Sequence, residues 1–226
     1  MKVLKIGHRG VASYAPENTL ASIRKALELG VDMVELDVRF CKTGEVVVIH
    51  NKKVNRTTNG RGLVSEKTLT ELKELKINKT EKIPTLAEVL NLINRKCKVN
   101  IELKGAGTPE PISKIVKAYV KNGWSYNDFL VSSYNFSMLE EIRKINPRIQ
   151  IGLLMEKAPK EIIGLARELK AYSINPRLKY ITKKFVDDAH KGGLKVFVYT
   201  VNKLKDIEKM KGMGVDGIIS DFPDRI

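Results

Sequence analysis

Short apolar runs rich in Val and Ile alternate along the chain with longer segments of helical periodicity. Their nearly continuous apolar character is typical of parallel strands that are covered on both faces. Eight segments are expected to be strands: Val3–His8, Met33–Arg39, Val99–Lys104, Phe129–Ser133, Gln150–Leu154, Tyr172–Asn175, Lys195–Thr200 and Gly217–Ser220. Seven are expected to be helices: Pro16–Leu29, Thr85–Asn94, Pro109–Asn122, Ser137–Ile145, Pro159–Leu169, Thr182–Lys191 and Lys203–Met213.

This alternation predicts an α/β fold, a (β/α)₈ TIM barrel that occupies residues 1–226 as a single domain. An open, doubly wound sheet is the alternative, but the sequence lacks a glycine-rich dinucleotide fingerprint. Two features depart from the repeat. Lys42–Glu45 is expected to turn into an extra strand, Val46–His50, which an insertion segment (residues 51–83) follows. The chain also stops soon after the eighth expected strand, so a final helix is not expected.

Carboxylates gather where the expected strands end, and barrel enzymes carry their active sites at that end. Glu35 and Asp37 lie two residues apart in one strand and therefore share a face, and Glu102 ends the next strand. Three converging carboxylates would repel one another by roughly 3 kcal/mol per pair at about 5 Å. A hard divalent cation would remove this repulsion, and an all-oxygen ligand set favours Mg²⁺ or Ca²⁺ over zinc. Ion pairs with Arg39 or Lys104 are an equally open interpretation of the spacing.

His8 and His50 end segments that are expected to lie side by side at the same barrel face. Such a pair suits general acid and base catalysis near neutral pH, although a lone histidine at a strand end is more often structural. Arg9 and Lys104 add cations that either bind a phosphate or form salt bridges with the carboxylates. Tyr199 ends another strand, where it contacts a substrate carbon chain or packs in the core. The combination indicates phosphoester hydrolysis.

The formal net charge of +15 favours anionic partners, such as phosphorylated metabolites, a membrane surface or nucleic acid, unless it reflects only a solvated surface. Scattered basic residues and an aromatic content of 6% argue against nucleic acid. The sequence has no apolar run of membrane-spanning length and no signal-peptide pattern, so we expect a cytoplasmic protein without membrane insertion. A missing final helix would expose an apolar seam that a homodimer would bury.

Several motifs span essentially the whole chain in a fixed order. They are His8-Arg9-Gly10 with Pro16-Glu17-Asn18-Thr19, Val34-Glu35-Leu36-Asp37-Val38, Val46-Val47-Val48-Ile49-His50, Arg56-Thr57-Thr58, Asn100-Ile101-Glu102-Leu103-Lys104, Val198-Tyr199-Thr200-Val201-Asn202 and Gly217-Ile218-Ile219-Ser220-Asp221-Phe222-Pro223. This combination closely resembles the glycerophosphodiester phosphodiesterase family, metal-dependent TIM-barrel enzymes that hydrolyse glycerophosphodiesters to glycerol 3-phosphate and an alcohol.

The resemblance implies a role for each candidate: His8 and His50 as catalytic residues, Glu35, Asp37 and Glu102 as ligands of Mg²⁺, Ca²⁺ or Mn²⁺, and Arg9 and Lys104 as phosphate contacts, with Tyr199 beside the substrate. Two positions depart from the family pattern, because Asn51 replaces an aspartate after the second histidine and Tyr199 replaces a tryptophan. Two rival interpretations remain. One is a lysophospholipase D-type enzyme at a membrane surface, and the other is a catalytically silent, anion-binding barrel.

Overall fold

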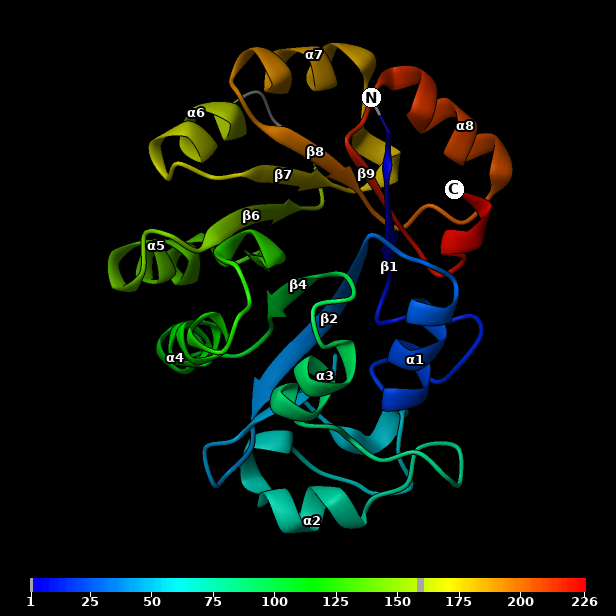
Figure 1. Cartoon of the computed structure of the whole chain (residues 1–226), viewed down its shortest axis with the longest axis vertical. Helices are drawn as coiled ribbons and strands as arrows, with labels where there is room; N and C mark the ends of the chain where they lie inside the picture. Colours follow the sequence, from blue (N-terminus) through cyan, green and yellow to red (C-terminus); the bar gives the residue numbers. More distant parts are fainter. Residues whose placement is uncertain (1, 158–160) are drawn as a thin grey trace.

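The protein is described by a computed structural model that covers residues 2–157 and 161–226. Within those residues, eight parallel strands form a closed barrel (Figure 1): β1 (Leu4–Gly7), β2 (Met33–Phe40), β4 (Lys98–Leu103), β5 (Phe129–Ser133), β6 (Gln150–Met155), β7 (Ser173–Pro176), β8 (Lys195–Val198) and β9 (Gly217–Ser220). The ring closes because β1 pairs with β2 on one side and with β9 on the other. The (β/α)₈ prediction is therefore confirmed.

The outer face of the barrel is covered by helices (Figure 1): α1 (Leu20–Glu28), α3 (Leu86–Ile93), α4 (Pro109–Lys121), α5 (Phe136–Ile145), α6 (Glu161–Glu168), α7 (Lys183–Lys191) and α8 (Leu204–Met213). Each follows the expected segment closely except the first. The expected start of α6 at Pro159 lies outside the described residues. After β9, the described residues form only a 3₁₀ turn, Pro223–Arg225.

The first helix begins later than the sequence suggested. Thr19 is its N-cap and accepts a hydrogen bond from the backbone N–H of Ser22. The preceding Asn18 has φ 58°, in the left-handed region, and therefore cannot belong to the helix. Pro16 starts a turn rather than the helix, and this turn brings Asn18 to the mouth of the barrel.

The insertion is a folded layer below the barrel in Figure 1. The extra strand before it is β3 (Val46–Val48), which runs antiparallel to β2, and the insertion itself contains α2 (Leu69–Glu74) and two 3₁₀ turns. Its own apolar cluster consists of Cys41, Val47, Ile49, Val54, Val64, Leu72, Ile77 and Ile83. The sequence predicted the position of this segment but not its structure.

The inside of the barrel changes from apolar to polar along the strands. Side chains alternate across a strand, so Met33, Glu35 and Asp37 of β2 all point inward. Met33 belongs to a buried apolar cluster that also contains Ile6, Leu130, Phe197 and Ile219. The two carboxylates lie nearer the C-terminal ends of the strands. Apolar packing therefore closes the barrel toward the N-terminal ends of the strands, and polar groups lie at the mouth, where the strands end.

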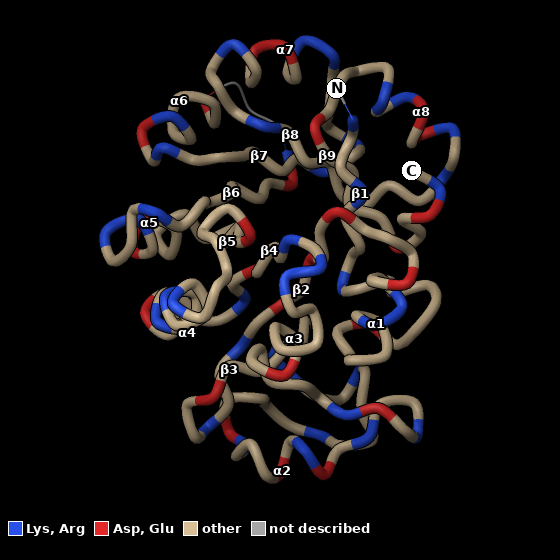
Figure 2. The backbone as a smooth tube through the Cα atoms, viewed as in Figure 1, with Lys and Arg blue, Asp and Glu red and all other residues tan. Residues whose placement is uncertain are grey.

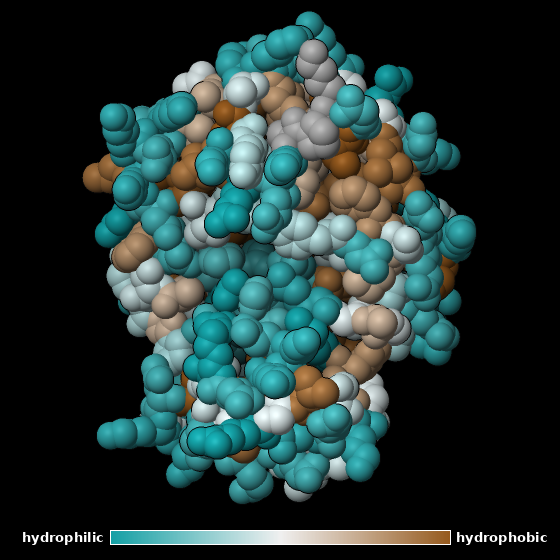
Figure 3. All heavy atoms as spheres, turned by 180° about the vertical axis from the view of Figure 1, so that it is seen from behind, coloured by the Kyte–Doolittle hydropathy of each residue, from teal (hydrophilic) through white to brown (hydrophobic). Residues whose placement is uncertain are grey.

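Figures 2 and 3 show how charge and hydropathy are distributed over the described residues. Lys and Arg are distributed over the outer helices and loops (Figure 2), and hydrophilic residues cover most of the face shown in Figure 3. None of the described helices is long and apolar enough to span a bilayer. Cys41 and Cys97 are both buried and free, so they form no disulfide.

Candidate active site

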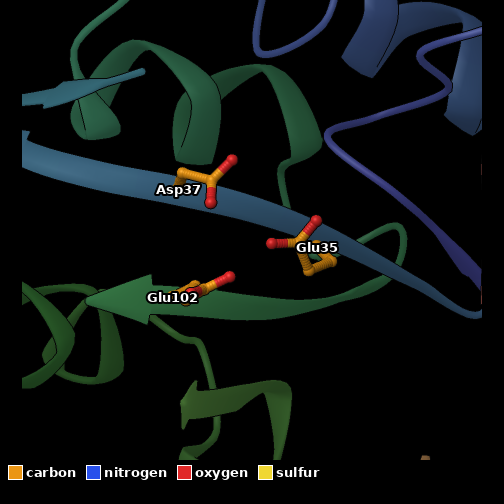
Figure 4. A group of neighbouring side chains, drawn as sticks. All are labelled: Glu35, Asp37 and Glu102. Atoms are coloured by element: carbon orange, nitrogen blue, oxygen red, sulfur yellow. The ribbon is translucent and has the colours of Figure 1, made fainter. Parts of the chain in front are cut away.

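Three carboxylates meet inside the barrel mouth (Figure 4). Glu35 and Asp37 come from β2 and Glu102 from β4, and the strand register places Asp37 directly beside Glu102. One oxygen of each carboxylate lies within 4.8 Å of the others, and all three residues are at least nine-tenths buried. Asn18 fixes Asp37, because its side-chain amide donates to Oδ2 over 2.9 Å and its Oδ1 accepts from the Asp37 N–H.

The electrostatics of this cluster favour a cation. Burial and the charge of Asp37 raise the pKa of Glu35 to about 7 and that of Glu102 to about 8. Burial also acts to raise the pKa of Asp37, but the charges of Lys104 and Arg9 outweigh it and hold that pKa below its usual range. Asp37 Oδ1 and Glu102 Oε1 are buried, and the Lys104 ammonium lies 3.5 Å from the first and 2.5 Å from the second. Three buried carboxylates that two cations only border form an all-oxygen set that fits a hard divalent cation.

His8 follows β1 and has a carboxylate partner. Its Nδ1 lies 2.6 Å from Asp221 Oδ1, in the loop after β9. Asn202 anchors that carboxylate, since its Nδ2 donates to Asp221 Oδ2 over 2.7 Å and its Oδ1 accepts from the Asp221 N–H. Burial acts to lower the pKa of His8, but the bond to Asp221 and the charge of Glu35 outweigh it and raise the pKa. Asp221 therefore stabilises the protonated imidazole.

His50 reaches the same pocket by a different route from the expected one. We expected the two histidines to end neighbouring strands, but β3 is antiparallel and pairs with β2, not with β1. The hairpin after β2 returns the chain to the mouth, where the N–H of Ile49 donates to the Asp37 carbonyl. His50 Nδ1 lies 2.8 Å from Asn51 Oδ1, and burial lowers the pKa of His50. Its partner is thus a neutral amide.

Two cations border the carboxylates. The Arg9 guanidinium donates to Glu17 over 2.9 Å, and its Nε lies 3.4 Å from Asp37 Oδ2. Lys104 Nζ forms ion pairs with Glu102 at 2.5 Å and with Asp37 at 3.5 Å. The salt bridges that the sequence left open are therefore present, and since both cations also line the pocket, their contact with a phosphate stays a prediction.

The first loop needs glycine to bring Arg9 and His8 into place. A Cβ on Gly7 would lie 2.1 Å from the carbonyl oxygen of Gly10, which is far closer than any allowed contact. Gly10 has φ +86°, a conformation that other residues rarely adopt. The tight loop allows the Arg9 N–H to donate to Glu35 Oε2 over 2.9 Å. The His8-Arg9-Gly10 motif thus has a backbone role in addition to the chemical role expected from the sequence.

All but one of the predicted site residues line one pocket of about 700 Å³, and Asp37 lies just beneath it. Tyr199 lies on the wall opposite the carboxylates, where its hydroxyl donates to the Met155 carbonyl and accepts from Tyr134. The Lys104 ammonium lies 5.5 Å from the centre of the Tyr134 ring. Arg177 and Lys179 extend the pocket away from the carboxylates. The pocket can accommodate a phosphodiester with polar groups on both sides.

The chain also matches known proteins over most of its length. The model of the glycerophosphoryl diester phosphodiesterase family matches residues 8–225. The chain belongs to this family. It is 40% identical to the glycerophosphodiester phosphodiesterase of Caldanaerobacter subterraneus subsp. tengcongensis, over 100% of this chain and 97% of that protein. It is 35% identical to the corresponding enzyme of Bacillus altitudinis, over 96% and 94%.

A solved structure of a family member is also similar throughout. It is a phosphodiesterase from Oleispira antarctica in complex with the product sn-glycerol-3-phosphate. The identity is 31%, the TM-score is 0.90, and the match covers 98% of this chain and 94% of the other. The protein is thus a phosphodiesterase of the hydrolase class that acts on glycerophosphodiesters. Members of this family use a divalent metal, and the buried carboxylates have the chemistry to hold one.

Sequence reasoning missed the residues that orient the expected ones. Asp221 and Asn202 both lie in motifs that carry the family resemblance, but nothing in their spacing connects them to His8, which is 213 positions from Asp221. Asn18 belongs to a matched motif to which the sequence analysis assigned no role, and it binds Asp37. Arg56 was part of a matched motif without a role, and it contacts Glu17 and Asn51.

Proposed function

We propose that this enzyme hydrolyses glycerophosphodiesters to glycerol 3-phosphate and an alcohol with one divalent cation held by Glu35, Asp37 and Glu102. The observation that carries the proposal is the close approach of these three buried carboxylates, within 4.8 Å, inside a pocket that two histidines also line. Mg²⁺ or Ca²⁺ suits the oxygen ligands, and Mn²⁺ is an acceptable substitute. Bound there, the ion supplies a Lewis acid for the phosphoryl oxygens.

Arg9 and Lys104 are the proposed phosphate contacts. Both line the pocket and both are already oriented by carboxylates, Arg9 by Glu17 and Lys104 by Glu102. A preorganised cation stabilises the charge that develops on the phosphoryl oxygens without reorganising during the reaction. Arg9 offers a planar fork of donors and Lys104 a compact charge, so the two contacts complement each other. Tyr199 is proposed to pack against the carbon chain of the substrate.

The two histidines are proposed to divide the proton transfers according to their partners. Asp221 stabilises the imidazolium of His8, which therefore gives its proton to the leaving alkoxide as the phosphorus–oxygen bond breaks. Burial lowers the pKa of His50, whose partner is a neutral amide, so His50 stays unprotonated and accepts the proton of the nucleophile as the new phosphorus–oxygen bond forms. The nucleophile is water or the substrate's own glycerol 2-hydroxyl. The second route forms a cyclic phosphate, which water then opens.

The test is turnover of glycerophosphocholine by the purified protein, with glycerol 3-phosphate measured in a coupled assay. Activity should disappear after dialysis against EDTA and return with Mg²⁺, Ca²⁺ or Mn²⁺. Full activity in metal-free protein would refute the metal proposal. A trapped cyclic phosphate would identify the 2-hydroxyl route. No turnover with any cation would favour the silent, anion-binding alternative.

Residues 1–226 are proposed to act as a single domain. The insertion supplies Arg56, which contacts residues beside both His50 and Arg9, so the site is incomplete without it. A homodimer that buries the side of the barrel between α1 and α8 stays a prediction, which light scattering at high protein concentration would test. The small phosphodiester is the proposed partner, with no role for nucleic acid and none for insertion into a membrane.

A further inference from the structure

The hydrogen bond between His50 and Asn51 depends on which end of the amide faces the ring. A neutral imidazole carries its proton on Nδ1 or on Nε2, and the partner of one nitrogen decides the tautomer. A carboxylate would settle this choice, since it can only accept. The side chain of Asn51 has an oxygen that accepts and an NH₂ group that donates, so it can support either tautomer of His50. The contact over 2.8 Å therefore does not fix the ring by itself.

Arg56 removes this ambiguity. Its Nε lies 2.9 Å from the same Asn51 atom that contacts His50. A guanidinium has donors and no acceptor, so the atom that faces it must be the amide oxygen. Because Oδ1 then accepts from both neighbours, the Nδ1 of His50 has to be the donor. The neutral ring consequently has an unprotonated Nε2.

The position of Arg56 is itself held by a second contact. Its two terminal nitrogens donate to the Glu17 carboxylate, one of them over 2.8 Å. Glu17 also accepts from Arg9, so the pair Arg56–Glu17 joins the insertion to the first loop. Arg56 comes from a 3₁₀ turn, Val54–Arg56, and does not line the pocket. It therefore acts on the site through other residues.

We propose that Arg56 is a positioning residue that fixes the tautomer of His50 through Asn51 and so keeps Nε2 of His50 as a proton acceptor. Its effect on turnover rests on the proposed function of His50, whereas the tautomer itself does not. Without Arg56 the amide is free to rotate and to present its NH₂ group to Nδ1. The ring would then carry its proton on Nε2, where it cannot accept one from a nucleophile.

The tautomer is measured directly by nitrogen NMR of the Mg²⁺-loaded protein with ¹⁵N-labelled histidine, at a pH where His50 is neutral. His8→Gln and His190→Gln variants assign the other two rings. The wild type should show a protonated Nδ1 at His50. Arg56→Met should show a mixture of the two tautomers or mainly the other one. A ring that keeps its Nδ1 proton in full in Arg56→Met would overturn the proposal.

A rescue experiment separates this role from a merely structural one. Arg56→Met should lower kcat by about 2-fold if both amide orientations become equally populated, and by about 10-fold if the flipped one is favoured by roughly 1.4 kcal/mol. In an Asn51→Asp background the same change should leave both the tautomer and kcat nearly unaltered, since a carboxylate can only accept. Arg61→Met, which removes an exposed cation from the same insertion, is the matched control and should not alter kcat.

Each alternative has its own signature. If Arg56 acts instead through Glu17 and Arg9, Arg56→Met should raise KM equally in both backgrounds, and the proposal is wrong. If His50→Ala keeps full activity, the proposed role of His50 fails, but the NMR result still decides the tautomer. If the double variant Arg56→Met, Asn51→Asp carried the His50 proton on Nε2, the proposal would also be overturned.

Discussion

Binding of a divalent cation to the metal-free protein should displace protons, and the number displaced should fall as the pH rises. The pKa of Glu35 is raised to about 7 and that of Glu102 to about 8, both by burial first and by the charge of Asp37 second. Asp37 stays ionised, because Lys104 and Arg9 hold its pKa below its usual range. Carboxylates bind a cation in their deprotonated form, so binding near pH 6 should release roughly two protons and near pH 9 almost none.

The affinity of the protein for the cation should rise with pH over the same range. Each displaced proton makes the apparent Kd tighten by up to about tenfold per pH unit, so two protons give as much as about 100-fold per unit near pH 6. Isothermal titration of Mg²⁺ or Ca²⁺ in two buffers with different protonation enthalpies counts the protons. Glu102→Gln should release about one proton fewer. Glu110→Gln, at an exposed site on α4, should release the same number as the wild type.

The stability of the metal-free protein should change with pH in the direction that these two groups dictate. Both folded-state pKa values lie above the reference value of 4.5, so the unfolded chain loses these protons first as the pH rises. Their stabilisation is therefore present below about pH 4.5 and is lost as the pH rises through about 7 to 8. The cation should raise Tm more at pH 8 than at pH 6. A Kd independent of pH, with no proton release, would refute the raised pKa values and this reasoning with them.

Three further results are expected. His8→Ala and His50→Ala should each lower kcat by about 10² to 10⁴ with an unchanged circular-dichroism spectrum, and a retained rate would remove that histidine from the mechanism. Asp221→Asn should lower kcat and move the basic limb of its pH profile to lower pH, because the raised pKa of His8 depends on that carboxylate; an unmoved limb would contradict this. Glycerophosphocholine and glycerophosphoethanolamine should have kcat/KM values within about tenfold, with lysophosphatidylcholine much poorer. A preference for the lysolipid would show that the substrate assignment is wrong.

The barrel could be predicted because its strands are buried on both faces and therefore leave an uninterrupted apolar signature. The carboxylates and cations of the site could be predicted for a related reason. Residues at the carboxyl ends of parallel strands meet at one mouth, so Glu35, Asp37 and Glu102 had to be neighbours once the barrel was accepted. Sequence patterns within single strands therefore identify the residues that would contact metal and phosphate.

Such patterns fail where the chain reverses direction or where two distant segments meet. The apolar run Val46–Val48 has the same composition in a parallel or an antiparallel strand, so the sequence did not show that β3 returns toward the mouth. The folded insertion was missed because its helix α2 has only six residues and depends on a small apolar cluster of its own. The start of α1 was misplaced because the left-handed Asn18 is held by a contact with Asp37, which no local pattern reveals.

The two histidines are chemically equivalent in the sequence, and the tertiary structure makes them different. His8 faces the carboxylate of Asp221, which Asn202 anchors, so its charged form is stabilised. His50 faces the amide of Asn51, and because burial lowers its pKa its neutral form is favoured, with Arg56 proposed to fix the tautomer through Asn51. A pair of identical groups that flanks one phosphate would have no preferred direction of proton transfer. In the proposed mechanism the unequal partners, one charged and one neutral, supply that direction before any substrate binds.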